Sequence, residues 1–589
     1  MKSQRFLYQL ANSVIRIFAA SVVFVLFLHS IYSTSFVGRA MREDGSTHSR
    51  TLNIQDNPWM HLAVFVLVSV LCVVAGKIYR RRQKGHNGVG GDVGQADRNI
   101  LFWLSVVFFG VGVLWIMLTQ MKPGSDPAKV YAIALEWRGG DFSAFEEGNY
   151  LFCYPFQAGI VLFYYLLTFL YGTESYIGPQ VVNAVALAVI YLLLSLMVRS
   201  FWKKERGLSV LAYVALMCWT PLFFFVTYIY GILPGMACSL GMMYLALRYV
   251  ETRKWRYIAP AALCIGMATV LKMNCLIYLV AVVCFLVYDI VDTLCGCGER
   301  RDKWKKCAAS AVFLLLMCTS VWGCGKITEK WVEHLSGYDM PEGEVMVSWV
   351  VMGLQEAPKG PGDYNGYNGD VFARNNYDTQ LATEQSLADL RKIIKRMWEN
   401  PLDEGVTFFA RKTAYQWNDP TFISMERMRG RKSAIEMAPP IRSLIEGKGS
   451  VALSVWLNYI QTLVFTGVLL YLFLNWKSKN LYELMGLVVF LGGYLFHMVW
   501  EASASYTIPY FTVMIPYAVK GFYDWAKVIV DLGERPREGI RMNRKAAVCA
   551  MGVAALLVLV FCFTRTNLFH RTIALDDGAE AITQYYHRG

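Results

Sequence analysis

The chain is a series of apolar segments, each close to twenty residues long, joined by polar or basic connections. A helix of about twenty apolar residues is long enough to cross the hydrocarbon core of a bilayer. Hydrophobic residues make up 55% of the 589 residues, which leaves too little polar surface for a soluble protein of this length. We therefore expect an all-α polytopic membrane protein.

The apolar segments predict about thirteen membrane crossings. Residues 156–171 are not counted, because their crossing would place the basic cluster after residue 198 outside, against the positive-inside rule. We expect that segment to lie along the membrane face or to re-enter it. The expected spans are residues 9–31, 59–78, 100–118, 177–198, 208–226, 228–250, 258–271, 275–291, 308–325, 455–474, 481–499, 506–522 and 546–563.

Lys and Arg gather in short clusters beside the apolar segments, and such clusters stay on the cytoplasmic side of a membrane. This rule places the N-terminus inside and the C-terminus outside, and it accounts for the net charge of +13 without a nucleic-acid partner. Four regions are expected: an N-terminal two-helix extension with a cytoplasmic linker (residues 1–98), a membrane core (99–326) that includes the first outer loop (120–157), a large extracytoplasmic loop (327–453), and C-terminal spans with an outer tail (454–589).

The large outer loop is far longer than an ordinary connection, and loops of this length are usually functional or disordered. Its Trp, Tyr and Met content favours an ordered structure. Residues 382–399 within it have the pattern of an amphipathic helix.

The first outer loop is rich in carboxylates and aromatic residues, and Asp126 is its sharpest candidate for chemistry. Asp126 follows a span by a few residues, so it is expected at the level of lipid headgroups. A half-buried carboxylate there would have the raised pKa that suits a general base acting on a hydroxyl. The sequence Ser125-Asp126-Pro127 is also typical of a helix start, and the two roles are compatible. Asp141, in a Gly-Gly-Asp turn, is a weaker rival.

Basic residues expected on the outer face run against the charge bias, so they are candidates for anion binding. Lys272 lies in a tight turn between two expected spans, while Lys122, Arg411 and Lys412 lie in outer loops. A phosphate-linked substrate needs such cations around its leaving group. Snorkelling to the membrane surface explains Lys272 equally well.

His497 and Glu501 are four residues apart near the outer end of an expected span, so they share one helix face. Ionisable residues at membrane depth are functional hypotheses by default, although a helix–helix hydrogen bond is an equal alternative. No run of ligands has metal-binding spacing, so neither a metal nor another cofactor is expected.

Several short stretches, taken in order, make the chain resemble the GT-C membrane glycosyltransferases over residues 100–525. The closest resemblance is to the branch of the dolichyl-phosphate-mannose protein mannosyltransferases and the lipid A aminoarabinose transferases. The stretches are Ser125-Asp126-Pro127, Gly140-Asp141, Tyr154-Pro155-Phe156-Gln157, Tyr230-Gly231 with Pro234, Trp349 with Met352-Gly353-Leu354, Tyr364-Asn365-Gly366, Trp417 to Phe422, and Trp500-Glu501-Ala502.

The resemblance implies a GT-C-like core, a polyprenyl-phosphate sugar donor, an extracytoplasmic active site in the cell membrane, and inversion at the anomeric carbon. It implies a cell-envelope acceptor, which could be a glycan polymer, a glycolipid or a protein. Asp126 matches the family's loop aspartate and is the expected base. The expected donor-phosphate ligands are Lys272, Arg411, Lys412 and Lys122, and the expected substrate-binding residues are Asp141, Tyr154, Trp417, Asp419, His497 and Glu501.

The chain also departs from this family. Pro127 follows the aspartate where the mannosyltransferases have Glu, and Ser505 precedes Tyr506 where relatives often have Arg. With Ser505 in place of that Arg, Lys272 or the pair Arg411 and Lys412 would have to supply the phosphate ligands. A transporter or flippase of lipid-linked glycans is the alternative, but such proteins often show internal repeats, and none is visible in this sequence.

Overall fold

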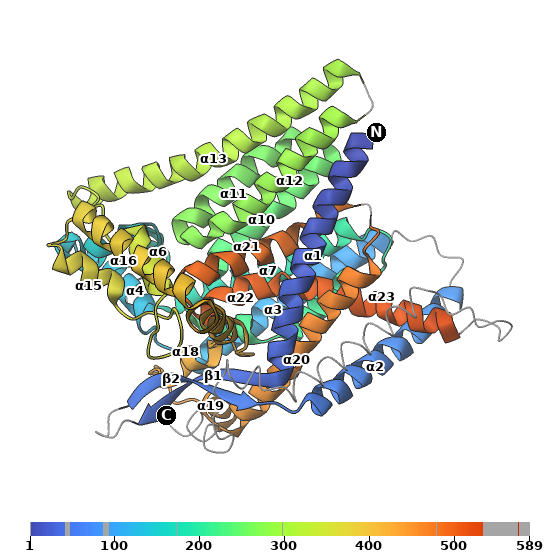
Figure 1. Cartoon of the computed structure of the whole chain (residues 1–589), viewed down its shortest axis with the longest axis horizontal. Coiled ribbons are helices and arrows are strands. Elements are labelled where there is room, and N and C mark those ends of the chain that lie inside the picture. The colour runs from blue at the N-terminus through green and yellow to red at the C-terminus, as the bar shows by residue number, and fades with distance from the viewer. Residues whose placement is uncertain are drawn as a thin grey trace.

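The computed structural model describes residues 2–41, 47–85, 93–172, 175–296, 299–478, 480–533 and 575. The expected span at residues 546–563 and the outer tail after it lie outside these residues. Most of the described chain is helical, and its described strands form one two-stranded sheet between the first two helices (Figure 1). This confirms the expected class of a helical membrane protein.

Eight described helices are long and apolar enough to cross a membrane, or nine if one bent pair is a single span. The expected count of about thirteen therefore does not hold for the part of the chain that the structure describes. The eight are α1 (Lys2–Tyr32), α2 (Pro58–Gly85), α3 (Val93–Thr119), α7 (Ile177–Phe201), α12 (Leu276–Cys295), α13 (Arg300–Ser336), α20 (Lys448–Leu474) and α21 (Met485–Val499).

The bent pair replaces the straight span expected at residues 208–226. Its parts, α8 (Leu208–Cys218) and α9 (Pro221–Phe224) with the turn after it, bend by 60°. Pro221 has no backbone N–H with which to continue α8, so the helix must break there. The next segment forms α10 (Ile232–Thr252), whose Gly, Pro and Ser residues make it less apolar than the eight clear spans.

Two more expected spans are too short. Helix α11 (Ile258–Leu271) has 14 residues, fewer than a straight crossing needs. The segment expected at 506–522 is divided into α22 (Ala504–Thr512) and α23 (Ile515–Gly533). Helix α6 (Ala158–Tyr171), which was expected not to cross, also has only 14 residues.

The apolar helices pack into one bundle (Figure 1). Helix α10 packs between α7 and α11, α11 packs against α13, and α20 packs against α23. Most buried apolar side chains belong to one continuous cluster that runs through these helices. The bundle thereby fixes the ends of α11, α12 and α21, and these ends carry the candidate site.

Helix α1 is part of this bundle, because it packs against α20 and holds a buried ion pair. The Arg16 guanidinium lies 2.9 Å from Oε1 of Glu483, and both side chains are almost fully buried. The indole N–H of Trp202 donates to the other oxygen of Glu483 at 3.2 Å. The charge of each partner is therefore balanced inside the protein, as burial requires.

A β-hairpin, which the sequence analysis missed, connects α1 to α2. Strands β1 (Ser33–Met41) and β2 (Thr47–Gln55) pair antiparallel. The backbone N–H of Ser35 donates to the carbonyl of Asn418 at 3.1 Å, and that of Thr51 donates to Lys359 at 3.0 Å. The hairpin therefore ties the N-terminal region to the large loop.

One end of the bundle carries the long loops, and we call it the loop end. The first loop contributes α4 (Asp126–Arg138) and α5 (Tyr150–Cys153), and α4 packs on α6. The amphipathic helix expected at 382–399 is confirmed as α16 (Thr379–Glu399). The other elements of the large loop are α14 (Met346–Gly353), α15 (Tyr367–Arg374), the π-helix η6 (Pro401–Thr407), α17 (Phe408–Trp417), α18 (Ser424–Met428) and α19 (Pro439–Glu446).

Candidate functional site

Asp126 is the first residue of α4, at the loop end of the bundle. The preceding residue, Ser125, is the N-cap, and its backbone has a φ of 56°. Pro127 occupies the first turn, where a missing N–H costs nothing. The helix start expected from the sequence is therefore confirmed. The Asp126 side chain is exposed and not half-buried as expected, so its carboxylate is accessible to a ligand.

Lys272 lies in the turn between α11 and α12 and reaches the same region as Asp126. Its ammonium group lies 3.9 Å from the centre of the Tyr230 ring, a cation–π contact. Burial lowers the pKa of Lys272 to about 8, and the nearby carboxylates of Asp126 and Glu501 oppose this shift. The fold thus brings together three residues that are far apart in the sequence.

Helix α21 ends at Val499, so the expectation that Glu501 shares a helix face with His497 is wrong. Glu501 is buried, and burial raises its pKa to about 8. The hydroxyl of Tyr506 donates to its Oε1 at 3.3 Å. The ring nitrogen Nδ1 of His497, which is fully buried, lies 3.2 Å from the Glu501 carbonyl oxygen. His497 thus holds the backbone that carries Glu501.

The structure adds two cations that the sequence analysis missed, Arg427 and Arg431. The Arg427 guanidinium lies 5.2 Å from the Tyr228 ring centre and donates to Oγ of Ser505 at 3.3 Å. The Arg431 guanidinium donates to Oγ of Ser125 at 3.0 Å, next to Asp126. A signal was present in the sequence, because residues 425–432 form a basic cluster in a loop that is expected outside.

Tyrosine side chains surround the acidic and basic groups. The Tyr230 hydroxyl accepts a hydrogen bond of 2.7 Å from the side chain of Gln157. Burial raises the pKa of Tyr150, and the charge of Asp126 raises it further. These phenols remain protonated and can donate hydrogen bonds to an anionic ligand. The tyrosines within electrostatic range of Asp126 are Tyr150, Tyr228, Tyr230, Tyr364 and Tyr506.

Two of the expected phosphate ligands have other partners. Arg411 forms an exposed ion pair of 2.9 Å with Glu356. Lys412 is fully buried, and its ammonium group donates to the carbonyl oxygens of Gly353 and Trp500. Burial lowers the pKa of Lys412 to about 7. Lys412 therefore holds the ends of α14 and α21 together. Lys122, another expected phosphate ligand, is exposed and lines a small hollow together with Arg427 and Arg431.

Three of the expected substrate-binding residues have structural partners. The exposed Asp141 accepts a backbone hydrogen bond from Ser143, which lowers the pKa of Asp141. Trp417 is buried in the main apolar cluster. Asp419 is buried and accepts hydrogen bonds from the Thr421 and Ile423 backbones at 2.8 and 3.1 Å, so it closes a turn.

Tyr154 lies beside Glu344, a buried acid that the sequence analysis did not select. The Asn368 amide donates to Oε2 of Glu344 at 2.6 Å, and burial raises the pKa of Glu344 to about 7. Tyr154 also contacts the rings of Phe156 and Trp349. Aromatic faces next to a carboxyl group suit a polar ligand with apolar faces, such as a sugar.

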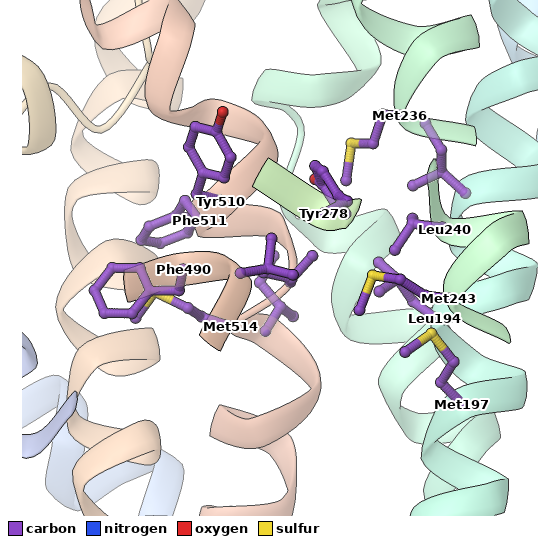
Figure 2. Close-up of a cluster of buried hydrophobic side chains, with 14 of the residues drawn as sticks. Leu194, Met197, Met236, Leu240, Met243, Tyr278, Phe490, Tyr510, Phe511 and Met514 are labelled. Atoms are coloured by element: carbon purple, nitrogen blue, oxygen red, sulfur yellow. The ribbon is translucent and has the colours of Figure 1, made fainter. Parts of the chain in front are cut away.

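Two small hollows lie in the apolar core between α10 and the α22–α23 segment. The first is a cavity of about 30 Å³ lined by Met236, Lys272, Tyr506 and other residues. The second is mostly apolar and lies between Leu240 and Tyr517. Figure 2 shows the buried cluster around them, with Met236, Leu240 and Met243 of α10 on one side and Tyr510, Phe511 and Met514 on the other.

The site therefore combines an exposed carboxylate, several cations and a ring of tyrosines. Such a set can bind an anion and can accept a proton from a hydroxyl group. Among the described residues no group of three or more His, Cys, Asp or Glu side chains is arranged to hold a metal ion. Compared with protein-family models and with curated proteins, the sequence matches none.

Proposed function

We propose that the chain is a membrane glycosyltransferase that transfers a sugar from a polyprenyl-phosphate donor to a cell-envelope acceptor. The observation that carries this proposal is that Asp126, Lys272 and Arg427 lie within electrostatic range of one another at the loop end, beside the cavity that Lys272 lines. The charged groups match a phosphate and an attacking hydroxyl. By the charge bias of the loops, the reaction takes place on the extracytoplasmic face.

In this mechanism Asp126 takes the proton of the acceptor hydroxyl as its oxygen attacks the anomeric carbon. The bond from that carbon to the phosphate oxygen breaks, and the lipid phosphate leaves with the bonding electron pair. Lys272 and Arg427 stabilise the negative charge that develops on the leaving phosphate. Attack from the face opposite to the phosphate inverts the anomeric configuration.

Arg427 supplies a guanidinium at a place where the resembled family often has one on another residue. Ser505 occupies that position here, and the Arg427 side chain donates to its hydroxyl at 3.3 Å. Arg427 comes from the large loop instead of the helix that follows α21. This supports a phosphate site in which Arg427 of the large loop replaces the Arg that relatives often have at the position of Ser505.

Lys272→Arg tests the donor site through its pH dependence. Lys272 is protonated below its pKa of about 8 and neutral above it, so the wild-type KM for donor should rise as the pH increases through about 8. Arg stays protonated throughout, so Lys272→Arg should lose most of that rise, while Lys272→Met should show a high KM at every pH. Lys129→Met, at an exposed position on α4, is the control. A wild-type pH dependence that persists unchanged in Lys272→Arg would remove Lys272 from the phosphate site.

Glu501→Gln distinguishes the role of Glu501 from that of Asp126, the proposed base. Glu501 is protonated, and therefore neutral, below its pKa of about 8. Because Gln is neutral as well, Glu501→Gln should lower kcat less than about tenfold near pH 7. Above that pH a charged Glu501 would repel the donor phosphate, so the wild type should lose activity there more steeply than Glu501→Gln. Steady-state kinetics across this pH range measure the difference. If Glu501→Gln is inactive at pH 7, Glu501 acts in its ionised form and competes with Asp126 as the base.

A further inference from the structure

Helix α16 and the π-helix η6 expose a stripe of large apolar side chains at the loop end. Trp398 is 85% exposed and Leu402 is 73% exposed, both unusual values for residues of this type. The inner face of α16 is buried through Ala382, Ser386 and Ile393, so the exposed side chains are not part of its packing. The exposed stripe consists of Leu387, Ile394, Trp398, Leu402 and Val406.

Leu387, Ile394 and Trp398 are spaced by seven and four residues, which places them along one side of α16. Leu402 and Val406 follow on η6, after the break at Asn400. Charged side chains beside the stripe are largely paired with one another. Lys392 lies 2.9 Å from Asp389, and Arg396 lies 3.1 Å from Glu404. The stripe is therefore apolar, and its flanks carry little net charge.

Helix α16, which carries most of the stripe, is linked through α14 to the end of the apolar helix α21. Helix α16 packs on α14, and α14 ends at Gly353 against the backbone of Trp500, immediately after α21. Helix α17, which follows η6, donates a hydrogen bond from Gln416 to the carbonyl of His497 in α21. In Figure 1, α16 lies at the same end of the bundle as the outer end of α13.

We propose that the α16–η6 stripe inserts into the interfacial layer of the bilayer and holds the large loop against the membrane surface. A side of a helix that carries Trp, Leu, Ile and Val beside long polar side chains has the composition of a helix lying in the membrane plane. The loop end lies at the ends of α21 and α13, which are long and apolar enough to cross a bilayer. Since the flanking charges are paired, burial of apolar surface drives this contact, and it should depend little on salt.

A photoreactive phenylalanine analogue placed at position 398 of the full chain tests this proposal. The protein is reconstituted into nanodiscs of a neutral and of a mixed neutral and anionic phospholipid, irradiated, and examined by mass spectrometry. The same analogue at Gln385, an exposed position on another side of α16, is the control. We expect phospholipid adducts at 398 at least about tenfold above those at 385, in both lipid mixtures and at low and high salt.

Adducts to a second copy of the chain at 398 would overturn the proposal and make the stripe a dimer contact. Absence of lipid adducts at 398, or equal yields at 398 and 385, would overturn it as well. As a second measurement, Trp398→Ser with Leu402→Ser should reduce lipid adducts formed by the same analogue at Ile394, without lowering the melting temperature. An unchanged yield at position 394 in that double variant would also contradict the proposal. None of these readouts depends on glycosyl transfer.

Discussion

Asp126→Asn is expected to lower kcat for sugar transfer about 10²–10⁴-fold while the protein stays folded. The amide is almost the same size as the carboxylate, but it cannot accept the proton of the attacking hydroxyl. The side chain is exposed and the N-cap is Ser125, so the substitution removes little that stabilises the fold. Release of polyprenyl phosphate from a labelled donor measures the rate, and the melting temperature measures the fold.

Asp141→Asn is the matched control in the same loop. Asp141 is also exposed, but its carboxylate accepts a hydrogen bond from the Ser143 backbone within a turn. Its substitution should leave kcat close to that of the wild type. If Asp126→Asn were as active as Asp141→Asn, Asp126 would serve only at the start of α4, and Glu501 would be the next candidate for the base.

Glu483→Leu is expected to destabilise the protein by about 3–5 kcal/mol, because it leaves the Arg16 guanidinium buried without its partner. Trp202 would lose the acceptor of its indole N–H in the same substitution. Arg16→Met with Glu483→Leu removes both charges, so the double variant should recover most of the loss. Thermal unfolding of the purified proteins in one detergent compares the variants.

An exposed ion pair provides the control for this prediction. Glu399→Gln breaks the pair with Lys395 on α16, whose side chains are both largely exposed, and should change stability by less than about 1 kcal/mol. If Arg16→Met with Glu483→Leu were as unstable as Glu483→Leu alone, packing around α1, and not the buried charge, would decide stability at this position.

Local patterns predicted much of the architecture. Runs of apolar residues gave the positions of the long helices, and the alternation of Leu, Ile and polar residues gave α16. Lys272 and Glu501 were selected because each is a charged residue at the end of an apolar segment. Residues at the same end of several spans must lie near one another, which is why the structure brings both close to Asp126.

Tertiary packing within the large loop could not be predicted in this way. Lys412 and Asp419 lie in a polar stretch, yet both are buried, because the segment folds over the ends of α14 and α21. The β-hairpin was missed because its strands are stabilised partly by contacts with the distant Asn418 and Lys359. Pro221 did carry a signal for the break between α8 and α9, since proline ends a helix, but counting apolar residues ignored it.

The central claim is that this site transfers a sugar from a lipid phosphate. The most direct test reconstitutes the wild-type chain in nanodiscs with a panel of labelled polyprenyl-phosphate sugars and an envelope fraction as acceptor. The account predicts that at least one donor is consumed, with one polyprenyl phosphate released for each sugar transferred and with inverted anomeric configuration. If no donor is bound or consumed, while lipid-linked glycans move between the two leaflets in vesicles that contain the protein, the chain is a transporter and the proposed function is wrong.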